Sequence, residues 1–532
     1  MSTQLLVGGR IYSAAAPDAT AMAVTDGVVV WLGADHVGRA LHPDAEVRDL
    51  DGAFVTPAFV EPHLHTTAYG LQRMGLDLSA ARSLPHCLEL LAQFAARHPD
   101  GAILADGWDE TRWPERRPPT AEDIDTAAGA GRVVYLARVD AHSAVASTAL
   151  LDAVPELRAA DGYRAGEPVR AQAHHLVRAA ARGHLTRAQR DAARRTALDT
   201  AAAHGVAVVH ECAGPEIEGE TDLRELLVFE HGVQVRAYWG QAVRSAGEAG
   251  DLVAELGAHA LGGDLFVDGS LGSHTAWLRE PYADHSGTGV SYLDTDAIAA
   301  HVRACTEAGI QAGFHAIGDA ALDAVVAGFG RVATELGGPA IAARGHRVEH
   351  AELLDSGQIE ALATWGVIAS VQPAFDRAWG GTDGMYAERL GVDRARASNP
   401  FAAMASAGVS LAIGSDAPVT ALDPWAAVRA AVHHRTAGHG LSPRAAFAAA
   451  TRGAWRAGGV RDGVAGTLAP GAPASYAVWD AAELVVGAPA DSVQRWSTDP
   501  RSRVPGLPPL TPGAELPRCL HTVHRGVTLY SA

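Results

Sequence analysis

The sequence predicts an α/β protein built on a (β/α)8 barrel, with a small β-sandwich formed by both chain ends and a large insertion after the first barrel strand. Short apolar runs alternate with helix-like stretches between residues 57 and 457. Several of these runs end in His or Asp, and catalytic groups of barrels lie at the carboxyl ends of strands. Strand-like runs near each end of the chain are too few to be stable alone, so we expect them to combine.

Residues 1–56 and 458–532 are therefore expected to form one composite β-sandwich domain, with the barrel in residues 57–457. Val, Ile, aromatic and Thr residues enrich the predicted terminal strands, and Gly and Asp occupy the turns. The predicted strands cover residues 4–12, 21–33, 46–56, 474–479 and 521–530. Residues 484–518 are rich in Pro, Gly and Ser and are expected to form an extended arm.

The first barrel strand begins at Phe54, and the segment from about 66 to 203 separates it from the next one. A βα unit needs only about 30 residues, so this segment is an insertion. Helix-like stretches cover residues 84–97 and 185–204. Trp108, Trp113 and His142 fall inside it and could line a pocket, although ordinary packing explains the tryptophans equally well. Trp239 and Trp277 are further candidates for an apolar pocket wall.

The other seven barrel strands follow in order, separated by stretches with helix signals. Strand four is followed by the glycine-rich stretch 269–274, which is not a phosphate-binding loop sequence. Thr295 and Ser442 are predicted N-caps of two helices that reach Ala308 and about Arg456, and Asp319 begins another helix. The strands are predicted at residues 206–211, 234–239, 264–268, 311–315, 367–372 and 410–416, with strand six ending at His350.

Composition limits the partners of the chain. The 532 residues carry a net charge of −18, which argues against nucleic acids and anionic membranes as ligands. The 4 Cys lie far apart without a C-x-x-C pair, as is typical of a reducing compartment. We read no signal peptide and no apolar run of the roughly 20 residues that cross a bilayer. The expectation is a cytoplasmic protein that acts on a small molecule, with a homodimer left open.

Five residues at predicted strand ends indicate a metal site. His63 and His65 are two residues apart on an extended strand, so both side chains point to the same side. His315, His350 and Asp416 end three later strands and should meet them at the same edge of the barrel. Imidazole and carboxylate are the ligands that Zn²⁺ prefers, together with thiolate. A carboxylate beside the metal can also move protons, and we assign that role to Asp416.

The chain resembles the amidohydrolase superfamily, and within it the branch of N-substituted formamide deformylase-like proteins, amidohydrolase family 3. The resemblance implies a metal-dependent barrel in which Asp416 is both a metal ligand and the general base. It also implies the large insertion after the first strand and the sandwich formed by both termini. The matching segments are Glu61-Pro62-His63-Leu64-His65, Gly107-Trp108-Asp109-Glu110, Asp268-Gly269-Ser270-Leu271-Gly272-Ser273, His315-Ala316-Ile317-Gly318-Asp319, Glu349-His350-Ala351 and Gly414-Ser415-Asp416-Ala417-Pro418.

The chain departs from this branch at one position that bears on the metal. The resemblance predicts Lys four residues before Asp268, where a carboxylated Lys can bridge two ions, but Asp264 stands there and the chain contains no Lys. We interpret Asp264 as a polar residue at a strand start that falls short of the metal. One Zn²⁺ held by His63, His65, His315 and Asp416 is then preferred, with His350 contacting substrate or water. The alternative is a second ion on His315 and His350 with an acidic bridge.

The predicted function is metal-dependent hydrolysis of an amide or N-formyl C–N bond in a small molecule. Deamination, isomerisation or decarboxylation on the same metal barrel is the alternative, because a fold does not determine its reaction. A non-catalytic scaffold is a third reading, disfavoured by the five ligand-type residues. Side chains that could support the ligands or contact substrate are Trp108, His142, His210, Asp264, Asp268 and His274.

Overall fold

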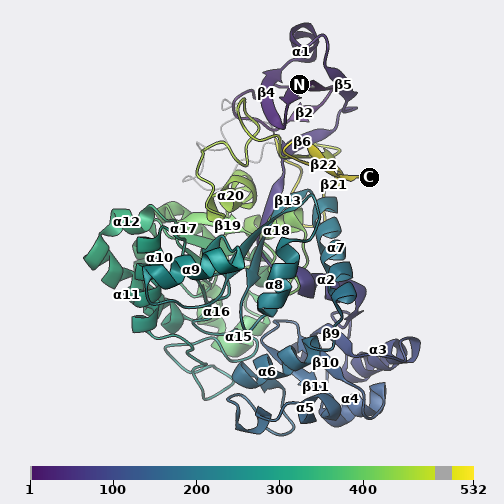
Figure 1. Ribbon diagram of the computed structural model, residues 1–532, viewed down its shortest axis with the longest axis vertical. Coiled ribbons are helices and arrows are strands. Elements are labelled where there is room, and N and C mark those ends of the chain that lie inside the picture. Colours follow the sequence, from purple (N-terminus) through teal and green to yellow (C-terminus); the bar gives the residue numbers. More distant parts are fainter. Residues whose placement is uncertain (1–2, 486–505) are drawn as a thin grey trace.

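The computed structural model describes residues 3–485 and 506–532, so residues 486–505 of the predicted arm lie outside the described part. Eight parallel strands form two sheets of four at the centre of the molecule (Figure 1). The first sheet, in the order β15-β14-β13-β7, contains β7 (Phe59–Leu64), β13 (Val206–Ala213), β14 (Gln234–Trp239) and β15 (Ala260–Leu261). The second, in the order β16-β17-β18-β19, contains β16 (Gly313–Ala316), β17 (Arg347–His350), β18 (Ile368–Val371) and β19 (Ser410–Ile413).

Single bridges connect the two sheets at both seams. Leu64 pairs with Ala417 at one seam, and Leu261 pairs with Ala312 at the other, both in parallel. Apart from these and a bridge between Phe266 and His315, no ladder crosses the seams within the described residues. The fold is therefore α/β with two parallel sheets, and closure into one barrel remains a prediction.

The fourth strand differs from its prediction. The strand β15 ends at Leu261, whereas the sequence predicted residues 264–268. Gly262 and Gly263 have φ angles of 156° and 69°, which side chains disfavour, and they turn the chain out of the ladder. Beyond them the chain returns to the sheet, because the N–H of His315 donates to the carbonyl of Leu265 at 2.9 Å.

Helices on the outside of the strands bury apolar faces against them. Their ends follow the capping rules, although Asp294, not the predicted Thr295, accepts the N-cap hydrogen bond of α10, from the N–H of Ala297 at 2.8 Å. Ser442 caps α19 as predicted, but the helix gives way at Ala449 to one π-helical turn. These helices are α9 (Ala246–Leu256), α10 (Thr295–Ala308), α11 (Asp319–Leu336), α13 (Ser356–Thr364), α17 (Phe401–Ala407), α18 (Pro424–Val432), α19 (Pro443–Ala448) and α20 (Ala454–Ala457).

Two further sheets lie at one end of the molecule, where both termini meet (Figure 1). One sheet, β4-β3-β1-β5, contains β1 (Thr3–Val7), β3 (Ala21–Thr25), β4 (Val28–Gly33) and β5 (Glu46–Asp49). The other, β2-β6-β20-β21-β22, contains β2 (Arg10–Ile11), β6 (Phe54–Pro57), β20 (Tyr476–Asp480), β21 (Arg518–His524) and β22 (Val527–Ser531). Leu6 and Val55 belong to one buried cluster that joins the two sheets. The ends of the chain thus share a sheet, while the exact domain boundaries stay predictions.

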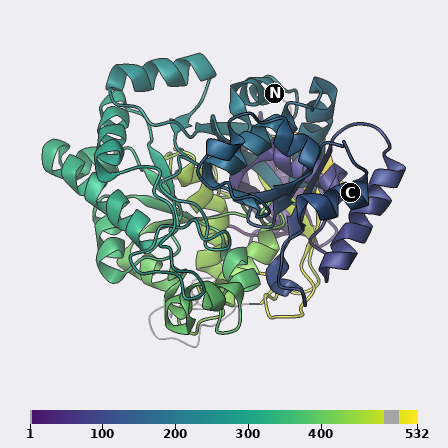
Figure 2. The same ribbon diagram turned by 90° about the horizontal axis from the view of Figure 1, so that it is seen from below.

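The insertion forms its own sheet at the opposite end of the long axis, and it lies in the foreground of the view from below (Figures 1 and 2). Its order is β12-β11-β10-β9-β8, formed by β8 (Leu76–Asp77), β9 (Ile103–Trp108), β10 (Val134–Arg138), β11 (Ser143–Ala146) and β12 (Val169–Arg170). The helices of this region are α2 (Thr66–Met74), α3 (Leu84–Arg97), α4 (Ala121–Ala128), α5 (Thr148–Asp152), α6 (Ala171–Arg182) and α7 (Arg187–Ala203). No helix within the described ranges is long and apolar enough to cross a membrane.

Candidate metal centre

Four donor groups converge where β7 ends. The Nε2 atoms of His63 and His65 lie 3.5 Å and 3.3 Å from Oδ1 of Asp416. The same two nitrogens lie 3.3 Å and 3.2 Å from the carboxylate oxygens of Asp264. Four ligands placed about 2.0–2.1 Å from one tetrahedral Zn²⁺ would be separated from each other by about 3.3 Å. The spacing of these donors therefore fits a metal ion.

The hydrogen bonds of His63 direct its free nitrogen into this cluster. Its Nδ1 lies 2.9 Å from Oε2 of Glu349, which accepts the ring proton. Burial opposes ionisation of Glu349, but Arg347 and His63 lower its pKa to about 2. Within the described residues, Nε2 of His63 and Oδ1 of Asp416 are buried without a hydrogen-bond partner. A carboxylate that holds the outer N–H of a ligand histidine is a common feature of metal sites, and a cation would satisfy both orphaned atoms.

Arg347 fixes the position of Glu349 from the other side. Its guanidinium donates to both carboxylate oxygens, at 2.5 Å and 2.7 Å, and to the carbonyl of Pro62 at 2.7 Å. It also lies 3.1 Å from Nδ1 of His210. His210 therefore contacts the arginine that holds Glu349 in place.

His315 and His350 form a second pair of donors. Nδ1 of His315 lies 3.0 Å from Nε2 of His350. The opposite ring nitrogens have acceptors of their own: the carbonyl of Gly269 lies 3.2 Å from Nε2 of His315, and Oε1 of Gln372 lies 2.8 Å from Nδ1 of His350. With the protons placed there, two lone pairs face each other across 3.0 Å. In this tautomer the contact is repulsive and a cation would make it favourable, whereas a proton on Nδ1 of His315 would make it a hydrogen bond.

Asp264 lies between the two pairs. Besides the contacts with His63 and His65, its Oδ1 lies 3.4 Å from Nδ1 of His315. The sequence favoured a polar residue too short to reach the ligands, and the geometry differs from that expectation. The reason is the turn at Gly262 and Gly263, which brings the backbone of Asp264 towards the site, so that a short side chain suffices.

The backbone is strained at two of these residues. His350 and Asp416 have φ angles of 68° and 55°, in the left-handed region that residues with a Cβ seldom adopt. Such strain persists only where the surroundings enforce it, and it is concentrated at functional sites. His350 ends β17 and Asp416 lies three residues beyond β19, and at both positions the strained backbone turns the side chain into the cluster.

A small cavity of about 60 Å³ opens beside the donors, and its lining combines the strand ends with the insertion. His142, predicted from the sequence as a pocket residue, lines it with its ring 5.1 Å from that of His315. Burial lowers the pKa of His142 to about 3, so this imidazole is neutral. The lining from the insertion also includes Asp106, Tyr135, Asp140, Arg178 and Arg182.

The apolar wall of the site consists of residues that the sequence analysis did not select. A smaller cavity of about 20 Å³ also borders His315 and His350 and is lined by Phe375, Trp379, Met385 and Tyr386. The helix α14 (Pro373–Trp379), which follows β18, carries the first two. The sequence Pro373-Ala374-Phe375 directly after the seventh strand was a usable signal for this wall.

Three other predicted residues make contacts outside the two cavities, although Oδ1 of Asp268 also lies 4.0 Å from Nε2 of His315. Trp108 is buried in the core of the insertion, where its indole N–H donates to the carbonyl of Leu136 at 2.9 Å. Asp268 accepts hydrogen bonds from the backbone of Trp277, Ile317 and Gly318, at 2.7–3.0 Å, and burial raises its pKa to about 6. His274 lies 3.0 Å from Asp284. None of the three lines the two cavities.

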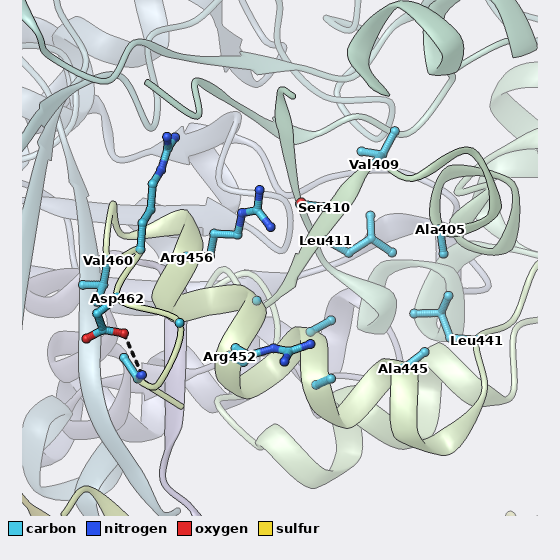
Figure 3. Close-up of a pocket in the computed structure, with 16 residues that line it drawn as sticks. Ala405, Val409, Ser410, Leu411, Leu441, Ala445, Arg452, Arg456, Val460 and Asp462 are labelled. Atoms are coloured by element: carbon cyan, nitrogen blue, oxygen red, sulfur yellow. Dashed lines mark hydrogen bonds between the residues drawn. The ribbon is translucent and has the colours of Figure 1, made fainter. Parts of the chain in front are cut away.

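A larger cavity, of about 650 Å³, lies elsewhere (Figure 3). It borders Ser410 and Leu411 at the start of β19, whereas the metal donors follow strand ends. Arg452, Arg456 and Asp462 line it together with apolar side chains. It contains none of the residues that approach one another at the candidate metal centre.

The chain is similar to known proteins over most of its length. The model of the amidohydrolase family matches residues 46–530. The Bacillus subtilis (strain 168) protein YtcJ is 28% identical over 449 residues, 77% of this chain and 80% of that protein. N-substituted formamide deformylase of Arthrobacter pascens is 24% identical over 81% of this chain and 83% of its own length. A solved metal-dependent hydrolase of uncharacterised function from Pyrococcus furiosus is 26% identical, with a TM-score of 0.67 over 90% of this chain and 98% of its own.

The family model covers most of the chain, and both donor pairs and Asp416 fall within the matched residues. This chain belongs to the amidohydrolase family.

Proposed function

We propose that this protein is a metal-dependent hydrolase of an amide or N-formyl C–N bond in a small molecule. The convergence of two His pairs and two carboxylates beside a small cavity supports this proposal most directly. The deformylase among its relatives hydrolyses the N-formyl group that its name states, which suggests the same class of bond here. Nitrogen and oxygen donors in this mixture suit Zn²⁺.

The two parallel sheets are inferred to act as one (β/α)8 barrel, whose carboxyl strand ends carry the site. When bound, the metal supplies a Lewis acid that polarises a carbonyl and lowers the pKa of water. Asp416 accepts the proton of the attacking water, whose oxygen adds to the carbonyl carbon. The C–N bond then breaks, and Asp416 delivers the proton to the departing nitrogen. The products are a carboxylic acid, or formate, and an amine.

We further propose that the site holds two ions. His63, His65 and Asp416 would bind one ion, and His315 and His350 would bind the other, with a carboxylate oxygen of Asp264 on each side. The preference for one ion depended on the missing Lys, because two close cations need an anionic bridge. The carboxylate of Asp264, which lies near both donor pairs, could supply that anion without carbamylation. Added bicarbonate should therefore leave metal content and activity unchanged.

Release of formate or acid from simple N-formyl and N-acyl amines, with metal-loaded and chelator-stripped protein, tests the hydrolytic function. Turnover that disappears on stripping and returns with Zn²⁺ supports the proposal. Turnover of amidines or aminopyrimidines with release of ammonia, and none of amides, would replace it by deamination. Protein that binds no Zn²⁺ would instead support a scaffold.

A further inference from the structure

Among the buried arginines of the described residues, Arg178 is the one that has no carboxylate partner. Arg178 is 8% exposed, yet no carboxylate oxygen of the described residues lies within 4.0 Å of its guanidinium nitrogens. The others each have at least one such partner, as Arg347 has in Glu349 at 2.5 Å. These other buried arginines are Arg138, Arg194, Arg347 and Arg389.

An unpaired buried cation is costly, because burial removes hydration that only an anion or several acceptors can replace. Arg178 has two acceptors, the carbonyl of Glu216 and Nδ1 of His175 at 3.0 Å, both on its Nη2. Its Nε is buried without a partner among the described residues. Burial lowers the pKa of Arg178 to about 10, whereas Asp140 and Glu110 outweigh burial at Arg138 and raise the pKa there. The guanidinium is therefore incompletely compensated.

The location of Arg178 gives this charge a use. Arg178 is carried by α6 of the insertion and lines the same cavity as His65, His315, His350 and Asp416. A molecule whose scissile bond lies against the metal donors would thus have Arg178 in the wall of its binding site.

The other charges of the cavity wall already have partners. Asp140 contacts Arg138 at 3.0 Å and accepts hydrogen bonds from Ser270 and Ser273 at 2.8 Å and 2.7 Å. Arg182 lies 3.4 Å from Glu218. Burial raises the pKa of Asp106 to about 7, so a large share of this carboxyl is protonated near neutral pH. Of the two arginines in this wall, Arg178 is the one with no carboxylate within 4.0 Å among the described residues, so its charge is the one that a ligand can neutralise.

We propose that Arg178 binds a carboxylate of the substrate, so that the substrates are small amides with a free carboxylate, such as N-formyl or N-acyl amino acids. The planar guanidinium presents several N–H donors in a geometry that matches a carboxylate. This inference rests on the proposed function for the reaction, but the recognition of the carboxylate is a separate claim about binding. The strongly negative net charge of the chain does not argue against an anionic substrate, because the charge nearest to the ligand contributes most to its binding.

Matched substrate pairs test the proposal through kinetics. N-formylalanine is compared with N-formylethylamine, which lacks only the carboxylate, on the Zn²⁺-loaded protein. We expect kcat/KM of the wild type to be at least about 10-fold higher for the carboxylate, a preference that Arg178→Gln removes mainly by raising KM. Arg178→Lys should restore part of it. Arg187→Gln, at an exposed position of α7, is the control for an unrelated Arg and should leave the preference intact.

A binding measurement separates failure of this inference from failure of the proposed function. In the Asp416→Asn background, titration calorimetry with the same two compounds needs no turnover. Tighter binding of N-formylalanine that disappears with Arg178→Gln supports the inference even in a protein that hydrolyses neither compound. Equal affinity for the two compounds, no binding of the carboxylate, or an equal loss for both in Arg178→Gln overturns it. Should Arg178→Gln fail to fold, the wild-type ratio and Arg178→Lys decide.

Discussion

The two ends of the central strands differ in the side chains and cavities that lie beside them. At the carboxyl ends, two His pairs and two carboxylates lie within hydrogen-bonding distance of one another around a cavity of about 60 Å³. At the start of β19 lies a cavity roughly ten times larger, lined by apolar groups and by the exposed Arg452 and Arg456 (Figure 3). Metal-dependent catalysis requires several donor atoms held close together, and the larger cavity has no such cluster among its lining residues. On this comparison we propose the smaller cavity, and not the larger one, as the site of the reaction.

Removing both ligands from β7 should produce the largest effect. The double variant His63→Ala/His65→Ala is expected to lose tight metal binding and all metal-dependent turnover, because half of the first donor set disappears. The fold should persist, since these side chains lie at the end of a strand and not in the packed layers. Elemental analysis and circular dichroism measure the two properties. Unchanged metal content in a folded double variant would place the metal elsewhere.

Asp416→Asn should come second, with a loss of at least about 10²-fold in kcat, the low end for a positioned acid–base group. The amide cannot accept the proton of the attacking water, while its oxygen still occupies the position of the ligand. Steady-state kinetics at saturating substrate and metal measure this loss. Turnover close to that of the wild type would remove Asp416 from the proton transfer.

A smaller effect is expected from Glu349→Gln, which changes the group that holds His63 at 2.9 Å. Metal affinity should fall about 10–100-fold, as for other groups that orient a metal ligand. Because Arg347 loses its anion, stability should fall too. Glu225→Gln is the matched control, because Glu225 likewise pairs with a buried arginine, Arg194, at 2.8 Å. Glu225 does not line the cavity beside the metal donors, so metal affinity should stay unchanged. Equal metal affinities in both variants, by competition with a chelator, would contradict the role of Glu349.

Substitutions in the larger cavity, at the start of β19, should have the smallest effect. Arg452→Gln/Arg456→Gln changes two exposed side chains of the larger cavity, and such substitutions usually alter stability by less than about 0.5 kcal/mol. We expect kcat/KM and metal content within about two-fold of the wild type. A loss comparable to that of Asp416→Asn would mean that the larger cavity takes part in the reaction.

Much of the fold and of the donor set could be predicted from the sequence, because local patterns carry it. The strand β14 has the predicted bounds Gln234–Trp239, and His63, His315 and His350 lie at or one residue before the ends of their strands, whereas His210 lies inside β13. Residues such as His63 and His315 can be recognised from the sequence, because a polar side chain at the end of a buried apolar strand usually has a functional or structural partner.

The remaining features depend on contacts between distant segments, which the sequence pattern does not contain. Asp264 reaches the donors because two glycines turn the chain, so its polar character alone indicated a strand start. Trp108 was a candidate pocket residue because of its size, yet the insertion has its own core to fill. Arg178 lies on an amphipathic helix of the insertion, and only the folded structure shows that it lines the cavity beside His65 and His315 without a carboxylate partner.

Anomalous scattering from crystals of the Zn²⁺-loaded protein, recorded on both sides of the zinc absorption edge, tests the central claim most directly. We predict two peaks per chain, one beside His63, His65 and Asp416 and one beside His315 and His350, with Asp264 in contact with both. The Asp264→Ala variant should lose at least one of them. A single peak that Asp264 does not approach would contradict the bridge, and no peak at these residues would contradict the metal centre itself.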